Sequence, residues 1–169
     1  MITGAGGSIG SELCRQIVCL KPKKIVLFEI SESSLYLIEQ ELRITGSANI
    51  EIFSVIGSVI DNKRMKNICE YYGVQTIYHA AAYKHVPLVE SNQTQGILNN
   101  TFGTLETVKA AISSNVETFV LISTDKAVRP TNVMGASKRV AELILQAFSK
   151  ESNNTKFTMV RFGNVLNSS

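Results

Sequence analysis

The sequence predicts an α/β fold in which a doubly wound parallel sheet carries helices on both faces. Five apolar runs of strand length alternate with helical patterns, and a glycine-rich segment lies between a first strand remnant and the first helix. With 169 residues, of which 44% are hydrophobic, the chain is long enough for one domain with a packed core.

The expected strands are the apolar runs bounded by turn residues. They cover residues 24–29, 50–57, 76–82, 118–123 and 157–163. Their near-continuous β-branched and aromatic character is typical of a parallel sheet that is covered on both faces. A half-exposed antiparallel sheet would instead alternate apolar and polar residues.

Helical patterns separate these strands and are expected to turn an apolar stripe toward the sheet. After the glycines the stripe is formed by Ile9, Leu13, Ile17 and Leu20, and behind the cap-rich SESS segment by Leu35, Ile38 and Leu42. Further helices are expected at residues 61–72, 94–115 and 133–150. The last of them carries Val140, Leu143, Ile144 and Ala147.

The two ends of the chain predict a piece of a larger protein. The sequence begins on what reads as the last residues of a strand and stops just after the run 157–163. We therefore expect a single domain over residues 1–169 that is truncated at both ends, with most of a substrate domain outside these residues.

Charge and cysteine content exclude several classes of function. The formal charge of +3 comes from scattered lysines and arginines, so neither nucleic acid nor a polybasic membrane patch is indicated. Three cysteines without a C-x-x-C pair and only two histidines leave a metal site short of ligands. A reduced cytoplasmic setting is expected, with a membrane anchor outside these residues left open.

The segment TGAGGSIG at residues 3–10 predicts a phosphate-binding loop. Its usable spacing is Gly4, Gly7 and Gly10, which would let a pyrophosphate approach the amides at a helix N-terminus in a Rossmann-type dinucleotide fold. Glu29 follows Gly10 by nineteen residues and can accept both hydroxyls of a ribose, which favours NAD over NADP. The alternative for the glycine segment is a turn that only connects two elements. The alternative for Glu29 is a helix-capping or solvated acid.

The segment STDKAVRPTNVMGASKR at residues 123–139 has a catalytic character. It places Asp125 beside Lys126 and ends with a second basic group, Lys138, one helical turn after Met134. Taken alone, MGASK is an ordinary helix start with a core methionine and a solvated lysine. The acid and base upstream favour an active site instead.

Several motifs resemble one known family. The glycine segment, HAAAYKHVP at 79–87, NTFGT at 100–104, the segment 123–139 and RFGNVL at 161–166 resemble the extended short-chain dehydrogenases. More narrowly, they resemble the nucleotide-sugar 4,6-dehydratases of polysaccharide biosynthesis, of the CapD type. The resemblance runs over essentially the whole chain. It implies a UDP-sugar substrate, typically UDP-N-acetylglucosamine, tightly held NAD(P) and a homo-oligomer.

The resemblance also implies roles for the segment 123–139. Asp125 would protonate the departing C6 hydroxyl, Lys126 would remove the C5 proton after burial had lowered its basicity, and Thr124 or Ser123 would hydrogen-bond the C4 carbonyl. Met134 stands where the superfamily usually has a tyrosine, a variant linked to a membrane-associated branch. Asp125 is then expected to take the C4 proton as well, while Lys138 binds the nicotinamide ribose.

The remaining candidate residues come from the same motifs. The expected cofactor-binding residues are Thr3, Gly4, Gly7, Ser8, Ile9, Gly10, Glu29, Ser58, Val59, Ala80, Ala81, Ala82, Asn100, Ser123 and Lys138. The expected substrate-binding residues are Lys84, His85 and Asn164, with Pro87 on the same loop. Ser58 replaces the aspartate that the family uses for the adenine amino group, so weaker cofactor binding is expected.

These observations predict the cofactor-binding part of a UDP-N-acetylglucosamine 4,6-dehydratase. The chain by itself is not expected to turn over, because most of the substrate-binding residues would lie outside it. Two alternatives remain open at this point. One is a nucleotide-sugar 4-epimerase or reductase, which has no need for the pair of Asp125 and Lys126. The other is a non-catalytic NAD-binding module.

Overall fold

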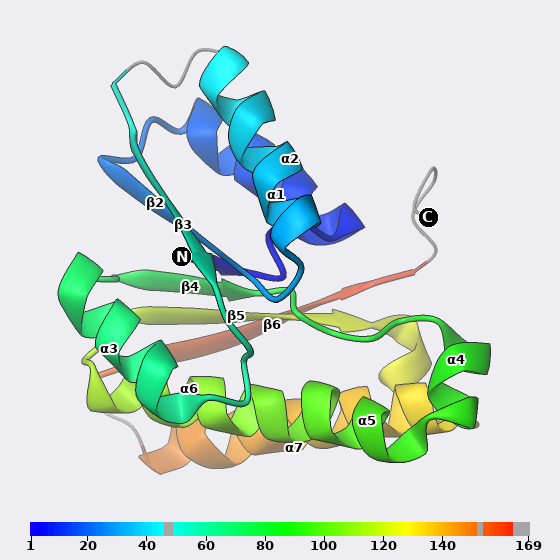
Figure 1. The fold of residues 1–169 in the computed structure, drawn as a ribbon. Coiled ribbons are helices and arrows are strands. Elements are labelled where there is room, and N and C mark those ends of the chain that lie inside the picture. Colours follow the sequence, from blue (N-terminus) through cyan, green and yellow to red (C-terminus); the bar gives the residue numbers. More distant parts are fainter. Residues whose placement is uncertain (46–48, 152–153, 164–169) are drawn as a thin grey trace.

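A computed structural model describes residues 1–45, 49–151 and 154–163 (Figure 1). Its centre is one parallel sheet of six strands in the order β3-β2-β1-β4-β5-β6. The strands are β1 (Ile2–Thr3), β2 (Lys24–Glu29), β3 (Glu51–Ile56), β4 (Thr76–His79), β5 (Thr118–Thr124) and β6 (Lys156–Phe162). This order reverses between β1 and β4, so the predicted doubly wound Rossmann-type fold is confirmed.

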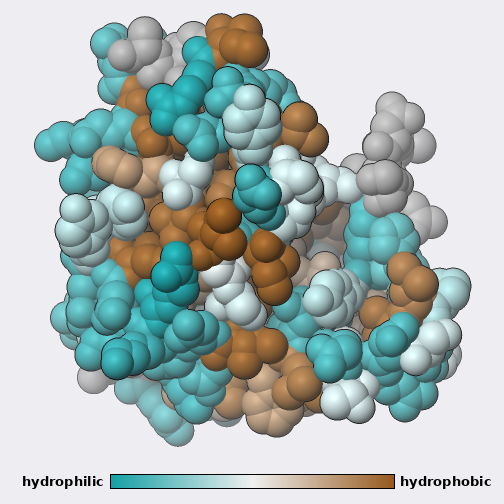
Figure 2. Space-filling model, in the orientation of Figure 1, coloured by the Kyte–Doolittle hydropathy of each residue, from teal (hydrophilic) through white to brown (hydrophobic). Residues whose placement is uncertain are grey.

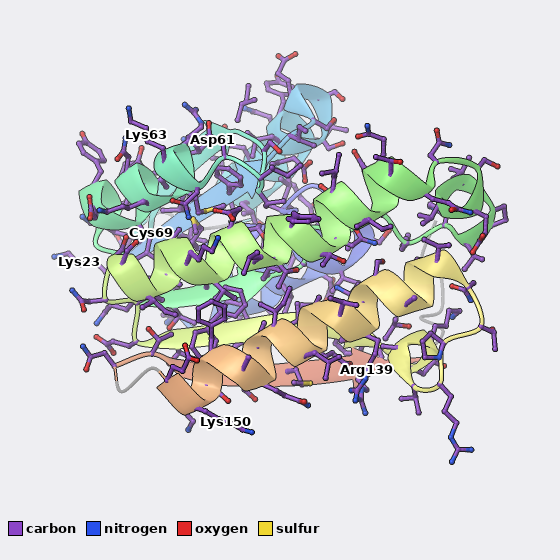
Figure 3. The ribbon with its side chains drawn as sticks, turned by 90° about the horizontal axis from the view of Figure 1, so that it is seen from below. Lys23, Asp61, Lys63, Cys69, Arg139 and Lys150 are labelled. Carbon is purple, nitrogen blue, oxygen red and sulfur yellow. The ribbon has the colours of Figure 1, made fainter. Side chains whose placement is uncertain are left out.

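Helices cover both faces of the sheet. On one face lie α1 (Ser8–Cys19) and α2 (Glu32–Ile44), and on the other lie α3 (Asn62–Tyr72), α6 (Gly103–Ser113) and α7 (Val133–Glu151) (Figure 1). Seen from below, α3, α6 and α7 lie side by side across the sheet (Figure 3). Two short helices, α4 (Val86–Ser91) and α5 (Gln93–Ile97), follow the loop after β4.

Each helix layer packs its own hydrophobic core against the sheet. The α1 and α2 side includes the buried Leu35, Ile38 and Leu42 on α2, as the sequence predicted. The core on the opposite face includes Met65 and Phe119. Burial of these side chains is the main force that holds the two layers to the sheet.

Two strand predictions need adjustment. The runs 24–29, 50–57, 118–123 and 157–163 are found within one residue at each end, but β4 stops at His79 and does not include residues 80–82. Beyond His79 the chain passes close to the glycine loop, where a Cβ on Gly4 would lie 2.7 Å from the Cα of Ala81.

The helix predicted at 94–115 is not one continuous α-helix. It consists of α5, a π-helical turn η1 (Leu98–Phe102) and α6, and α4 before it was not predicted. A π turn widens the helix by one residue and is frequent at functional sites. Here it contains Asn100, whose side chain is fully buried.

The stripes predicted for α1 and α7 are confirmed only in part, since Ile17 and Ile144 pack against the two cores. On α1 the fully buried position is Cys14, while Leu20 is 78% exposed. On α7, Val140 and Leu143 lie on the outside, and the buried face instead carries two ionisable side chains. Those two side chains, Lys138 and Glu142, belong to the site described next.

Two further properties concern only the described part of the chain. None of its helices combines the length and hydrophobicity required to span a bilayer. Nor do its histidines, cysteines and carboxylates gather in a group of three or more that could hold a metal ion.

Candidate active site

A cleft opens at the carboxyl ends of the strands, where ligands of doubly wound folds bind. It consists of a larger cavity of about 690 Å³ and a smaller one of about 180 Å³. Both are lined by Gly7, Ala80, Ala82 and Tyr83, so they are two ends of one elongated cleft. In the orientation of Figure 1, Figure 2 shows hydrophobic residues gathered near the middle of the view, between the two layers of helices.

The glycine loop approaches its neighbours too closely for side chains. A Cβ on Gly10 would lie 1.9 Å from the carbonyl oxygen of Gly4, and one on Gly6 would lie 2.4 Å from Cβ of Ser34. Gly4 has φ of 67°, a conformation that favours glycine. Gly7 would meet only one atom, at 3.3 Å. The tightest glycines are therefore Gly4, Gly6 and Gly10, and Gly6 was missed by the sequence analysis.

The start of α1 points at the larger cavity. Gly7 precedes the helix without a side-chain cap, and Ser8, Ile9 and Gly10 line the cavity with backbone amides that the helix itself does not use. Lys84 reaches the same place, since its Nζ donates to Oγ of Ser8 at 3.1 Å. Helix amides together with an ammonium group suit an anion such as a pyrophosphate.

Glu29 closes the smaller cavity at the end of β2. Its Oε2 accepts from the amide of Gly6 at 3.0 Å, and its Oε1 accepts from those of Ile30 at 2.9 Å and Ser31 at 3.1 Å. The residue is 9% exposed and lines the cavity, and its Oε2 keeps one lone pair that a ribose hydroxyl could use. Ser58, Val59 and Ala81 line the same cavity.

Asn100 on the π turn clamps the loop after β4. Its Oδ1 accepts from the amide of Tyr83 at 2.7 Å, and its Nδ2 donates to the carbonyl of Tyr83 at 2.9 Å and to Oγ of Ser137 at 3.1 Å. The sequence analysis placed Asn100 among the cofactor-binding residues. In the structure its side chain lines neither cavity and holds their shared wall.

His79 joins the glycine loop to α6 through a directed hydrogen-bond chain. The hydroxyl of Thr104 donates to the carbonyl of Asn100 at 2.7 Å, so it must accept from Nε2 of His79 at 3.1 Å. Nδ1 of His79 therefore accepts from the hydroxyl of Thr3 at 2.8 Å. Burial, and after it the charge of Lys138, lowers the pKa of His79 to about 3. Thr3 thus supports the loop instead of lining the cleft.

The acid and base after β5 lie at the entrance of the larger cavity. Thr124 and Lys126 line it, whereas Asp125 does not and its side chain is 59% exposed. The Asp125 carboxylate lies 3.6 Å from Nζ of Lys126, and a hydrogen bond from Thr124 is the main cause that lowers its pKa. The burial expected for Lys126 is not found, because its side chain is 40% exposed.

Met134 and Lys138 face the cavity from α7. Both are buried and both line it. Nζ of Lys138 donates to the carbonyl of Ile122 at 2.7 Å. Burial lowers the pKa of Lys138 to about 8, although the carboxylate of Glu142 opposes part of this shift. Helix α7 can lie close to the segment after β5 because Gly135 has no side chain. A Cβ at this position would lie 2.3 Å from the carbonyl oxygen of Lys126.

A buried ion cluster lies beneath these residues and was not predicted. Glu142 is fully buried and is contacted by Ser123, Arg139 and Arg161. A sequence signal existed, because a glutamate four residues after Lys138 lies on the same helix face. It was missed because the helix was read from its apolar residues Val140, Leu143, Ile144 and Ala147.

The structure thus brings most of the predicted site residues to one cleft. The larger cavity is lined by Gly7, Ser8, Ile9, Gly10, Ala80, Ala82, Lys84, His85, Ser123, Thr124, Lys126, Met134 and Lys138. The smaller one adds Gly4, Glu29, Ser58, Val59 and Ala81. Thr3, Asn100 and Asp125 lie beside the cleft, and Asn164 lies outside the described residues.

The family model described as "Polysaccharide biosynthesis protein" matches residues 1–169. The capsular polysaccharide biosynthesis protein CapD of Staphylococcus aureus is 48% identical over 99% of this chain and 28% of its own length. A UDP-N-acetylglucosamine 4,6-dehydratase (inverting) of Campylobacter jejuni is 32% identical over 99% of this chain and 49% of its own.

The chain also resembles a solved structure. The X-ray structure of Pen from Bacillus thuringiensis superposes with a TM-score of 0.90 at 36% identity. The match covers 99% of this chain and 50% of that one. The chain therefore spans half or less of the length of the proteins it resembles.

Proposed function

Because the chain belongs to the polysaccharide biosynthesis protein family, we propose that it forms the cofactor-binding part of a UDP-N-acetylglucosamine 4,6-dehydratase. The family resemblance drawn from the motifs is confirmed by the match to CapD. The observation that carries the proposal is the placement of Lys126, Met134 and Lys138 around one cavity at the carboxyl ends of the strands. The 32% identity to a named dehydratase supports the same reaction.

The proposed cofactor is NAD, and the residues of the cleft fit it. The crowded glycines leave room for a pyrophosphate at the start of α1, beside Lys84. Glu29 would accept the two hydroxyls of the adenosine ribose and would repel a 2′-phosphate. Bound NAD would accept the hydride from C4 of the sugar and return it to C6.

The residues at the entrance of the larger cavity would handle the protons. Asp125 takes the C4 proton and later gives it to the departing C6 hydroxyl. Lys126, which must be a neutral amine at this step, removes the C5 proton and returns it to C5 when the hydride reaches C6. The ketone at C4 acidifies C5, and water leaves across C5 and C6. Met134 fills the position of a phenol without taking part. The Asp125 carboxylate lies at the rim, so this proposal requires the sugar to extend to the ion pair with Lys126.

Asp125→Asn tests this assignment. The variant keeps the shape of the side chain and removes its basicity, so oxidation at C4 should fall by at least about a hundredfold. Product formation from UDP-N-acetylglucosamine by the full-length protein, followed by NMR, measures it. The matched control is Asp61→Asn, a carboxylate that caps α3 far along the chain from the proposed chemistry. Normal turnover of Asp125→Asn refutes the role of Asp125.

The rim position of Asp125 is also the observation that favours an alternative. If the pair with Lys126 is not used, the same cleft fits a nucleotide-sugar 4-epimerase or reductase, or a module that binds NAD without reaction. The NMR experiment, made with the full-length protein, separates the three. A dehydratase gives a 4-keto-6-deoxy sugar, an epimerase gives the C4 epimer, and a binding module gives no product.

We further propose that the protein assembles as a homo-oligomer through α7. The outer side of this helix carries an exposed apolar stripe that includes Val140, 44% exposed, and Leu143, 46% exposed. A second copy would bury such a stripe. Leu143→Glu should shift the molar mass measured by light scattering toward the monomer, and an unchanged mass contradicts the assignment of this surface.

A further inference from the structure

Glu142 has an unusual environment for a carboxylate. Its side chain is fully buried beneath the ends of β5 and β6. Arg161 of β6 donates through Nε at 2.8 Å and through Nη2 at 2.7 Å, and Arg139 of α7 donates at 2.9 Å. Ser123 of β5 donates from Oγ at 2.7 Å. Arg139 lies on the side of α7 nearest to β6 (Figure 3).

These partners keep the carboxylate charged. Burial by itself raises the pKa of Glu142, but the hydrogen bonds from Arg161, Ser123 and Arg139 outweigh it and lower the pKa to about 2. A buried charge without partners would be strongly destabilising. Glu142 therefore stays negatively charged next to the cleft, between two guanidinium groups.

The contact with Ser123 decides how this residue can face a ligand. A hydroxyl has a single proton, and that proton is donated to Glu142. Ser123 lines the larger cavity and so offers only lone pairs to it. It can accept a hydrogen bond from a ligand hydroxyl or amide, but it cannot donate to a carbonyl. The donor role considered for Ser123 in the sequence analysis does not agree with this geometry.

The charge also acts on Lys138, one helical turn before Glu142. Lys138 is buried, and its ammonium donates to the carbonyl of Ile122. The groups that face it from neighbouring elements do not offset its charge. His79 on β4 is neutral, and the ion pair of Asp125 and Lys126 on η2 (Asp125–Ala127) is exposed to solvent screening.

Two further cations lie near Glu142, and both are partly exposed. Arg139 and Arg161 have side chains that are 37% and 40% exposed, so water screens their repulsion of Lys138. The Glu142 carboxylate is not exposed at all. It is therefore the dominant nearby charge that favours the ammonium form of Lys138.

We propose that Glu142 is a positioning residue of the active site, which keeps Lys138 protonated and turns the proton of Ser123 away from the cleft. It does not touch the ligand and acts through these two residues. The cation at the cleft and the direction of the serine hydroxyl are then set by one buried carboxylate. The inference goes beyond the proposed function, since both effects exist in the protein without substrate.

Glu142→Gln tests the effect on Lys138. The side-chain nitrogen signal of Lys138, assigned with Lys138→Arg, is titrated by NMR in the unchanged protein and in the variant. Removal of the carboxylate should lower the titration midpoint by about one pH unit. A midpoint that stays within about 0.3 unit of that of the unchanged protein overturns the proposal.

Arg139→Gln is the matched control. It removes one partner of the cluster but leaves Glu142 charged and held by Arg161 and Ser123. The midpoint of Lys138 should then stay the same or rise slightly, because one positive charge is lost. An equal fall in both variants means that loosening of the cluster, and not the charge of Glu142, controls Lys138, which also overturns the proposal.

A double variant covers the case in which Glu142→Gln does not fold. Combining it with Arg161→Gln removes the guanidinium that would otherwise lose its buried partner. Since Arg161 is partly exposed and Glu142 is not, the loss of the carboxylate dominates and the midpoint should still fall. A midpoint near that of the unchanged protein in the double variant counts against the proposal.

The hydroxyl proton of Ser123 gives an independent measurement. Held by Glu142 in a buried contact, it should exchange with water slowly enough to be observed by NMR. Exchange should become at least about tenfold faster in Glu142→Gln. Exchange that is already fast in the unchanged protein contradicts the orientation proposed for Ser123. Both measurements are made without cofactor or sugar, so their failure is distinguishable from failure of the proposed function.

Discussion

The two ends of the cleft are held in place by different physical means. At the glycine-loop end, backbone lies against backbone, with no room for a Cβ on Gly4 or Gly10. At the lysine end, buried charges and hydrogen bonds hold Lys138, Ser123 and Glu142 in place. The difference teaches that one end depends on steric contact, which is independent of pH, and the other on protonation, which is not.

Gly10→Ala is the strongest test of the steric end. The added Cβ would overlap the carbonyl oxygen of Gly4 at 1.9 Å, and neither backbone can move without displacing the loop. We expect a loss of more than about 3 kcal/mol of unfolding free energy and of dinucleotide binding. Urea unfolding and calorimetric titration with NAD measure these. The control Gly7→Ala should cost less than about 1 kcal/mol, and equal losses would break the comparison.

Asn100→Ala tests the clamp that joins the two ends. The change leaves the amide and carbonyl of Tyr83 without their partners, so the unfolding free energy should fall by about 2–3 kcal/mol. The amide of Tyr83 should lose protection from hydrogen exchange by a similar free energy. Asn99→Ala, next to it, removes one hydrogen bond to Asn100 and should cost under about 1 kcal/mol. If both variants behave alike, the clamp is not at Asn100.

His79 should make the protein sensitive to acid. Its pKa is lowered to about 3 in the folded state, below that of the unfolded chain, so the unfolded state binds the proton first. The stability is fully present above about pH 6.5 and is lost as the pH falls. Between about pH 6.5 and 5 we expect a loss of about 1.5 kcal/mol. His79→Gln should flatten this part of the stability profile measured by urea unfolding, and an unchanged slope would assign it elsewhere.

Glu29→Gln should have the smallest effect and returns to the glycine-loop end. One oxygen is replaced by an amide nitrogen that faces a backbone N–H, so about 1 kcal/mol of stability should be lost. With the carboxylate gone, the preference for NAD over NADP should fall by about tenfold. Parallel binding titrations with both dinucleotides measure the ratio. A constant ratio means that Glu29 does not contact the ribose.

Much of the glycine-loop end was predictable because its signals are local. The glycines, the strand before them, the helix after them and the acid at the end of β2 stand in one short stretch of sequence. The importance of Gly6 was not predictable, since it depends on a contact with α2. A Cβ on Gly6 would lie 2.4 Å from Cβ of Ser34. A contact between two elements cannot be recognised from the residue spacing within one of them.

The residues of the lysine end were predicted, but the hydrogen bonds and ion pairs that join them were not. The sequence indicated Thr124, Asp125, Lys126 and Lys138, and the cavity collects three of them while Asp125 lies at the rim. The stripe of apolar residues on α7 pointed to the wrong buried face, because a helix that buries two ions conceals its inner side from a hydrophobic pattern. Arg161 and Ser123 reach Glu142 from two different strands.

The sequence by itself determined the family, the Rossmann-type order of elements and the glycine-rich start of α1, because each follows from residues that are neighbours along the chain. Only the tertiary structure decided which charges are buried, where the proton of Ser123 points and why Asn100 and His79 do not line the cleft. Those properties depend on distances between strands and helices that are brought together by packing, and burial changes the energy of a charge far more than its position in the sequence can indicate.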